Sequence, residues 1–197
     1  MKVIGITGGV GSGKSAVLEA IREACKCEII IADEVAHELE KKGHRCYDKL
    51  KKLLGDEILD TQGEIDKKKM AAMIFAKDSL LEEVNAIIHP EVKCYIKEKI
   101  EKAAREKKID FLFIEAALLI EDGYKEICDE LWYIWVKEEI RIQRLVVSRG
   151  YSLEKIRQIM DNQLSEEQFR TNCDKVIDNN GDLEATRKQI IGLVTDR

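Results

Sequence analysis

The feature that most constrains this chain is the segment Gly8–Ser15, GGVGSGKS, which fits the pattern G-x-x-x-x-G-K-[S/T]. It follows a short β-branched run, Lys2–Thr7, and it opens Lys14–Ala24, where apolar residues recur at helical spacing. Curled backbone N–H groups and a helix N-terminus both attract anions. The sequence therefore predicts a strand, a phosphate-binding loop and a helix, with a nucleoside triphosphate at the loop.

The residue types in this loop suit ATP and Mg²⁺, which are the predicted cofactors. Lys14 carries a mobile positive charge for the β- and γ-phosphates, and the hydroxyl of Ser15 is a ligand for Mg²⁺. The glycines let successive backbone N–H groups point inward. We expect nucleotide contacts at Gly9, Gly11, Ser12, Gly13, Lys14, Ser15 and Ala16.

Further short apolar runs along the chain predict four more strands. They are Glu28–Ala32, Phe111–Ala116, Leu131–Val136 and Lys175–Asp178. Helical patterns separate most of these runs, and this alternation is typical of a parallel sheet covered by helices on both faces. We predict an α/β fold with a five-stranded parallel sheet in one domain.

Two charged segments without strong strand patterns interrupt the alternation. The first is expected to form helices over Lys67–Ala76, Ser79–Ile88 and Glu91–Lys107, and Pro90 is placed where the last of these begins. The second begins near Gly150, with Ser152 as the expected N-cap of its first helix. We divide the chain into a core of about 1–40, 109–148 and 173–197, a helical acceptor-binding insert of about 41–108 and a lid of about 149–172.

Composition limits the partners and the compartment. The net charge of −5 argues against nucleic-acid or anionic-membrane partners, since those need a basic face. The longest apolar run, Phe111–Ile120, contains Glu115 and is too short to span a bilayer. The six cysteines form no C-x-x-C pair, and no signal-peptide pattern stands at the N-terminus. We expect reduced thiols and a cytoplasmic protein.

The loop alone does not define the reaction, because GTPases, motor ATPases and small-molecule kinases all use it. Asp60–Gly63 matches the D-x-x-G of GTPase switches, but no N-K-x-D motif is present, and we interpret it as a polar turn. Glu115 ends an apolar run and is a candidate Mg²⁺ ligand through water. The alternative for Glu115 is a strand-end carboxylate that faces solvent.

Asp33 follows the second predicted strand and has two interpretations. If that strand neighbours the first, the carboxylate lies near the γ-phosphate, where it can accept a proton from an attacking hydroxyl. Otherwise Asp33 is the N-cap of a helix over Glu34–Lys41. The spacing leaves both interpretations open.

Taken together, several segments in order along the chain resemble the dephospho-coenzyme A kinase family. They are ITGGVGSGKS, IIIADEVAHEL, Ile88-His89-Pro90, Glu115–Glu121, Arg144-Leu145 with Arg149 and Gln163, and Val176–Gly181. Departures from the family pattern are Ile31 and Glu115, each at an aspartate position, His37 at a position where arginine is common, and Ala117 at a proline position.

The resemblance implies transfer of the γ-phosphoryl group of ATP to the ribose 3′-hydroxyl of dephospho-coenzyme A. It gives Asp33 the role of catalytic base, and it places Lys14, Arg144 and the lid residue Arg149 around the transferred charge. Two alternatives stay open: a kinase for another small acceptor such as a nucleotide or a sugar acid, and a regulatory P-loop NTPase that acts through a protein partner. The sequence does not indicate an oligomeric state.

Overall fold

The computed structural model describes residues 1–195, apart from the side chain of residue 78, so the last two residues of the predicted core segment 173–197 lie outside the described part. A five-stranded sheet has the order β2-β3-β1-β4-β5. Its strands are β1 (Lys2–Thr7), β2 (Cys27–Ile31), β3 (Phe111–Glu115), β4 (Glu130–Trp135) and β5 (Lys175–Asp178). The pairs β1–β3, β1–β4 and β4–β5 are parallel. The predicted α/β fold is confirmed. Strands β1 and β5 have the predicted bounds, β3 ends one residue earlier, and β2 and β4 each begin and end one residue earlier than predicted.

Helices connect the strands. They are α1 (Lys14–Ala24), α2 (Ala32–Leu39), α3 (Tyr47–Leu54), α4 (Lys67–Phe75), α5 (Asp78–Glu106), α6 (Glu138–Arg149), α7 (Leu153–Asp161), α8 (Glu166–Asn172) and α9 (Leu183–Thr195), with short 3₁₀ turns at Asp56–Ile58 and Tyr124–Glu126. The described chain forms two compact units. One comprises Met1–Ile29 and the segment that begins at Ala103, and the other comprises Ile30–Lys102.

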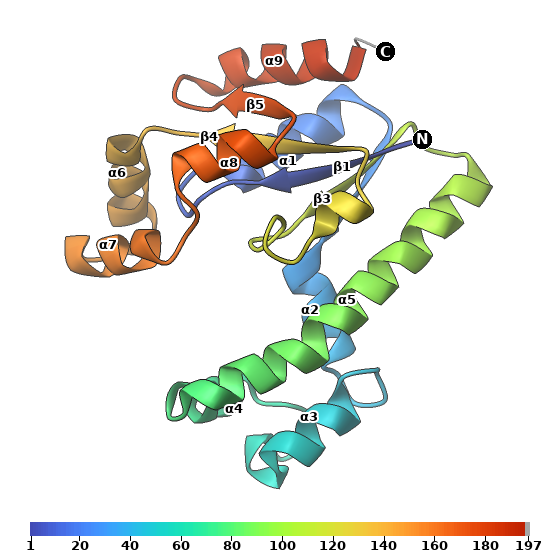
Figure 1. Cartoon of the computed structure of the whole chain (residues 1–197), viewed down its shortest axis with the longest axis vertical. Coiled ribbons are helices and arrows are strands. Elements are labelled where there is room, and N and C mark those ends of the chain that lie inside the picture. Colours follow the sequence, from blue (N-terminus) through green and yellow to red (C-terminus); the bar gives the residue numbers. More distant parts are fainter. Residues whose placement is uncertain (196–197) are drawn as a thin grey trace. The chain divides into compact units, whose positions relative to one another are not determined.

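The first unit has its main core on one face of the sheet, where α1 and α9 pack together (Figure 1). Alternate residues of β1, β3 and β4 point into this core, and Phe113 and Trp132 meet edge to face with ring centroids 5.6 Å apart. On β4, Tyr133 stacks on Phe169 of α8 at 4.8 Å. Burying each large apolar side chain contributes about 1.5–3 kcal/mol. Packing on α1, α9 and α8 thus holds the strands that lead into the phosphate loop.

The second unit corrects the prediction that Pro90 separates two helices. The structure has one helix, α5, that runs through Pro90 (Figure 1). Proline inside a helix costs about 3 kcal/mol, because it lacks an N–H and crowds the preceding turn. Four apolar side chains continue on one side of α5 past the proline and are 0–9% exposed: Val84, Ile88, Val92 and Ile96. Their burial, at about 1.5–3 kcal/mol each, outweighs that cost.

The polar turn at Asp60–Gly63 is confirmed. The Oδ1 atom of Asp60 accepts hydrogen bonds from the N–H groups of Gln62 and Glu64, and Gly63 has a positive φ of 78°. A short aspartate side chain that binds the following backbone is the usual way to close such a turn. The D-x-x-G match is therefore explained locally, without a switch function.

Candidate active site

The phosphate loop lies at the point where the sheet reverses its strand order. From β1 the chain builds β2 and β3 on one side and β4 and β5 on the other. Ligands of open α/β sheets collect outside the carboxyl ends of the strands at such a point. The loop follows the carboxyl end of β1, with β3 and β4 as neighbours, which makes this edge the candidate active site.

The loop has the backbone of an anion cradle. Gly13 is the N-cap of α1 and adopts a left-handed conformation, with φ 81°. The N–H of Ser12 donates to the carbonyl of Gly9 at 3.1 Å, which closes the turn. Within the described residues, the N–H groups of Gly11, Gly13 and Ser15 donate to no protein acceptor. These amides at the start of α1 are available for phosphate oxygens.

Lys14 is held at the base of the loop. Its ammonium donates to the carbonyl of Gly8 at 2.8 Å and lies 3.6 Å from Oε1 of Glu115. The strand register explains this pair, because Glu115 of β3 lies opposite Ile6 of β1, close to where the loop begins. The side chain of Glu115 is only 12% exposed, so the alternative of a solvent-facing strand-end carboxylate is not what the structure has.

Arg144, an expected catalytic residue, lies against the loop. Its guanidinium donates to the carbonyl of Asn179 at 2.9 Å and to that of Ser12 at 3.4 Å. The buried side chain of Asn179 also donates to the Ser12 carbonyl, at 2.8 Å, and accepts a hydrogen bond from the Thr186 hydroxyl at 2.9 Å. Asn179 is thus a loop support that sequence reasoning did not single out.

A second arginine on α6, Arg141, was missed altogether. It donates from Nε to the carbonyl of Val10 at 2.8 Å and from Nη2 to Oε1 of Gln163 at 2.9 Å. The same Gln163 oxygen accepts from the N–H of Val10 at 3.0 Å. Burial lowers the pKa of the Arg141 guanidinium from its ordinary value. The sequence signal that could have found Arg141 is its place one helical turn before Arg144.

The structure does not bring Arg149, the predicted lid arginine, to the loop. It ends α6, and its guanidinium lies 5.9 Å from the ring centroid of Tyr151. The predicted N-cap of α7 is confirmed, since the Ser152 hydroxyl accepts from the N–H of Lys155. In the described part of the chain, Arg149 contacts its own helix end rather than the phosphate loop.

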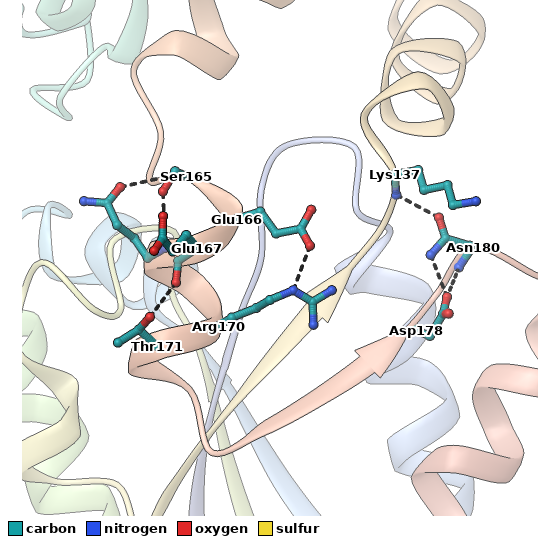
Figure 2. Close-up of polar contacts among 9 residues, drawn as sticks. Lys137, Ser165, Glu166, Glu167, Arg170, Thr171, Asp178 and Asn180 are labelled. Atoms are coloured by element: carbon teal, nitrogen blue, oxygen red, sulfur yellow. Dashed lines mark hydrogen bonds and ion pairs between the residues drawn. The ribbon is translucent and has the colours of Figure 1, made fainter.

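The surface of α8 carries an open pocket that no sequence pattern predicted. It has a volume of about 470 Å³ and is lined by Glu166, Glu167, Arg170 and Thr171. The Nε atom of Arg170 donates to Glu166 at 2.7 Å. Figure 2 shows this pair and, elsewhere in the view, Asn180, which accepts from the Lys137 N–H and donates to Asp178. The Arg170 guanidinium lies 4.9 Å from the ring centroid of Trp135, so this arginine serves local packing.

The interpretation of Asp33 as a helix cap is wrong. Helix α2 begins at Ala32, so Asp33 lies within its first turn, and the N-cap is Ile31 without a side-chain hydrogen bond. The carboxylate of Asp33 is exposed. The condition for its catalytic interpretation is also corrected, because β2 neighbours β3 rather than β1.

The donors near the loop fit a magnesium ion that phosphates bring with them. Within residues 1–195, no three His, Cys, Asp or Glu side chains gather as a metal cage. Mg²⁺ usually keeps waters and takes one or two protein oxygens beside the substrate phosphates. The exposed hydroxyl of Ser15 and the carboxylate of Glu115 are such oxygens.

Comparison with known proteins identifies the family. The family model described as dephospho-CoA kinase matches residues 2–185. The chain belongs to the dephospho-CoA kinase family. A dephospho-CoA kinase of Streptococcus agalactiae is 36% identical over 194 residues, which cover 96% of each chain. One of Streptococcus pyogenes is 36% identical over 188 residues, which cover 95% of this chain and 94% of the relative.

Solved structures show the same fold. A protein from Thermus thermophilus superposes with a TM-score of 0.81 at 25% identity and covers 99% of this chain and 97% of its own. A dephospho-CoA kinase from Campylobacter jejuni has a TM-score of 0.75 at 21% identity, over 98% and 96% of the two chains. Membership of this family makes the chain an ATP-dependent kinase. No helix within the described residues is long and apolar enough to cross a membrane.

Proposed function

We propose that this enzyme transfers the γ-phosphoryl group of ATP to the ribose 3′-hydroxyl of dephospho-CoA, which gives CoA and ADP. The observation that carries the proposal is the phosphate loop at the sheet's reversal point, in a chain that matches the dephospho-CoA kinase family model over residues 2–185. Phosphoryl transfer depends on positioning and charge neutralisation more than on covalent chemistry. The residues around the loop supply both.

The loop side of the reaction falls to Lys14, Arg144 and the N–H groups at the start of α1. The Lys14 ammonium contacts the Gly8 carbonyl and the Glu115 carboxylate, and we expect it to turn to the phosphates when ATP binds. Ser15 and Glu115 would hold Mg²⁺, the latter through water. The bound ion supplies positive charge at the β- and γ-phosphates. Arg144, fixed on two carbonyl oxygens, adds a cation beside Ser12.

The acceptor side falls to Asp33. As the 3′-oxygen bonds to the γ-phosphorus, the bond from that phosphorus to ADP breaks, and the hydroxyl proton passes to the Asp33 carboxylate. Two observations support this role: the Asp33 carboxylate is exposed just beyond the carboxyl end of β2, and it does not cap helix α2. The helical insert of about 41–108 would hold the acceptor, and the lid of about 149–172, with Arg149, would exclude water from the transferring group.

The experiment that tests the proposal is an ADP-release assay with ATP and Mg²⁺ against a panel of hydroxyl acceptors. We expect turnover with dephospho-CoA and little with nucleotides or sugar acids. If only one of those other acceptors is phosphorylated, dephospho-CoA is not the substrate and the proposal is wrong. Hydrolysis without any acceptor, stimulated by a protein, would instead identify a regulatory NTPase. We also propose a cytoplasmic location, which fractionation of the source cells would test.

A further inference from the structure

Three groups from distant parts of the chain meet at Val10 in the phosphate loop. The Val10 carbonyl accepts from Nε of Arg141 on α6, and the Val10 N–H donates to Oε1 of Gln163, which follows α7. Nη2 of Arg141 donates to the same Gln163 oxygen and closes the triangle. Both backbone polar groups of this loop residue are thereby bonded to the segment predicted to be the lid or to the helix that leads into it.

The loop is shaped to receive this arginine. A Cβ atom at position 9 would lie 2.3 Å from Nη2 of Arg141, and one at position 11 would lie 2.9 Å from the Arg141 carbonyl oxygen. Both distances are shorter than those that Cβ atoms keep from other heavy atoms in proteins. Gly9 and Gly11 therefore leave room for α6, in addition to any approach of phosphate. The contact between α6 and the loop is built into the packing of this unit.

Within the described residues no carboxylate lies within ion-pair distance of the Arg141 guanidinium. The half-buried guanidinium donates to the oxygens of Val10 and Gln163, and the Glu138 carboxylate attracts it from a longer distance. A cation held in this way costs desolvation free energy, so its two charge-assisted hydrogen bonds carry the contact. The planar fork of arginine supplies both donors at a fixed angle, which lysine cannot do.

We infer that Arg141 and Gln163 are positioning residues, a latch that fixes Val10 and so presets the phosphate loop for ATP while tying the lid segment to it. The latch acts before any acceptor binds. Its role in the reaction rests on the proposed function, but its existence does not. Tests can therefore separate the two.

Amide hydrogen exchange of Val10, followed by NMR in the free protein, tests the latch directly. Gln163→Ala removes the acceptor, and we expect Val10 exchange to speed up about tenfold or more, as for a lost hydrogen bond in a local opening. Gln163→Glu keeps an acceptor oxygen and should keep the protection. The matched control is Gln158→Ala on the exposed face of α7. Unchanged Val10 exchange in Gln163→Ala would overturn the latch.

Kinetics test what the latch does. Arg141→Ala should raise KM for ATP about tenfold or more, with kcat much less affected, since loop presetting is lost before chemistry begins. Arg141→Lys keeps the charge but not the fork and should behave like Arg141→Ala. The effects of Arg141→Ala and Gln163→Ala should be less than additive. Arg22→Ala on α1 is the exposed control.

The outcomes separate the two levels of the argument. If Arg141→Ala lowers kcat and leaves KM for ATP unchanged, the variant has only lost folded protein. If Arg141→Lys restores KM fully, the positive charge alone is sufficient. Either result overturns the positioning role. If dephospho-CoA is not phosphorylated at all, the proposed function fails. The latch then still stands if the Gln163 and Arg141 variants expose the Val10 amide and weaken binding of a non-hydrolysable ATP analogue measured by calorimetry.

Discussion

Asn179 is a buried polar residue whose loss should destabilise the unit that carries the phosphate loop. It is 5% exposed, and its amide joins two buried partners: Nδ2 donates to the Ser12 carbonyl at 2.8 Å, and Oδ1 accepts from the Thr186 hydroxyl at 2.9 Å. Thr186 is 0% exposed, so its hydroxyl depends on protein acceptors. Asn179→Ala thus removes two hydrogen bonds and leaves the buried Thr186 hydroxyl with only a longer contact, 3.4 Å to the Asp182 carbonyl.

The magnitude follows from these contacts. A net hydrogen bond contributes about 0.5–1.5 kcal/mol, and a buried polar group left with a poor partner adds part of the about 1–3 kcal/mol that a fully unpaired group costs. Asn179→Ala should therefore lower the free energy of unfolding by about 2–4 kcal/mol. For a chain of this length, each kcal/mol lowers Tm by about 2–4 °C, so the melting temperature should fall by about 5–15 °C. Urea unfolding followed by circular dichroism measures the free energy, and a thermal scan measures Tm.

A double-mutant cycle makes the reasoning refutable. Thr186→Val alone leaves the Asn179 oxygen without its donor and should cost about 1–3 kcal/mol. In the double variant no stranded partner remains at this contact, so the total cost should be smaller than the sum by about 1 kcal/mol. Asn162→Ala, at an exposed amide that donates to the Gln158 carbonyl, is the control and should stay within about 0.5 kcal/mol of the parent. The argument would be refuted if the two single costs added exactly in the double variant. It would also be refuted if Asn179→Ala lowered the free energy of unfolding by less than Asn162→Ala does.

Three other predictions concern the site and the thiols. Lys14→Ala should abolish phosphoryl transfer in the coupled assay while thermal unfolding stays close to that of the parent. Asp33→Asn should keep ATP affinity but lower kcat by about 10²–10⁴-fold, and near-normal turnover would exclude it as the base. Burial raises the pKa of both Cys25 and Cys173 to about 12, so these thiols stay protonated and should react with iodoacetamide only as the pH rises towards that value. The exposed Cys94 should be alkylated first at neutral pH, as peptide mass spectrometry would measure.

Local patterns predicted the elements whose cause is local. The strand before the loop, Lys2–Thr7, and the helix after it, Lys14–Ala24, have the predicted bounds, because apolar periodicity and the glycines that flank it decide both. The same local reasoning was wrong at Pro90. There, buried apolar side chains before and after the proline stabilise one continuous helix by more than the proline destabilises it. The size of that stabilisation depends on tertiary packing, which the sequence does not show.

Strand order was the other limit. Nothing within Cys27–Ile31 tells whether this strand pairs with β1 or β3, since both neighbours offer the same apolar surface. The loop residues of the candidate site were predicted, because a motif carries them. Its supports were not, because the contact of Arg141 with Val10 spans 131 residues and that of Asn179 with Ser12 spans 167. Such contacts leave at most an indirect local signal, such as the place of Arg141 one helical turn before Arg144.

These supports change how the loop's glycines are explained. The motif alone assigns them to the close approach of phosphate. In this chain a Cβ atom at position 9 would meet the Arg141 guanidinium, and one at position 13 would lie 2.7 Å from Nδ2 of Asn179. The two glycines therefore face protein groups that themselves hold the loop, at Val10 and at Ser12. Since α6 and the turn after β5 hold the loop at Val10 and at Ser12, its amides are already arranged before a nucleotide binds, and the phosphate site for ATP is preformed.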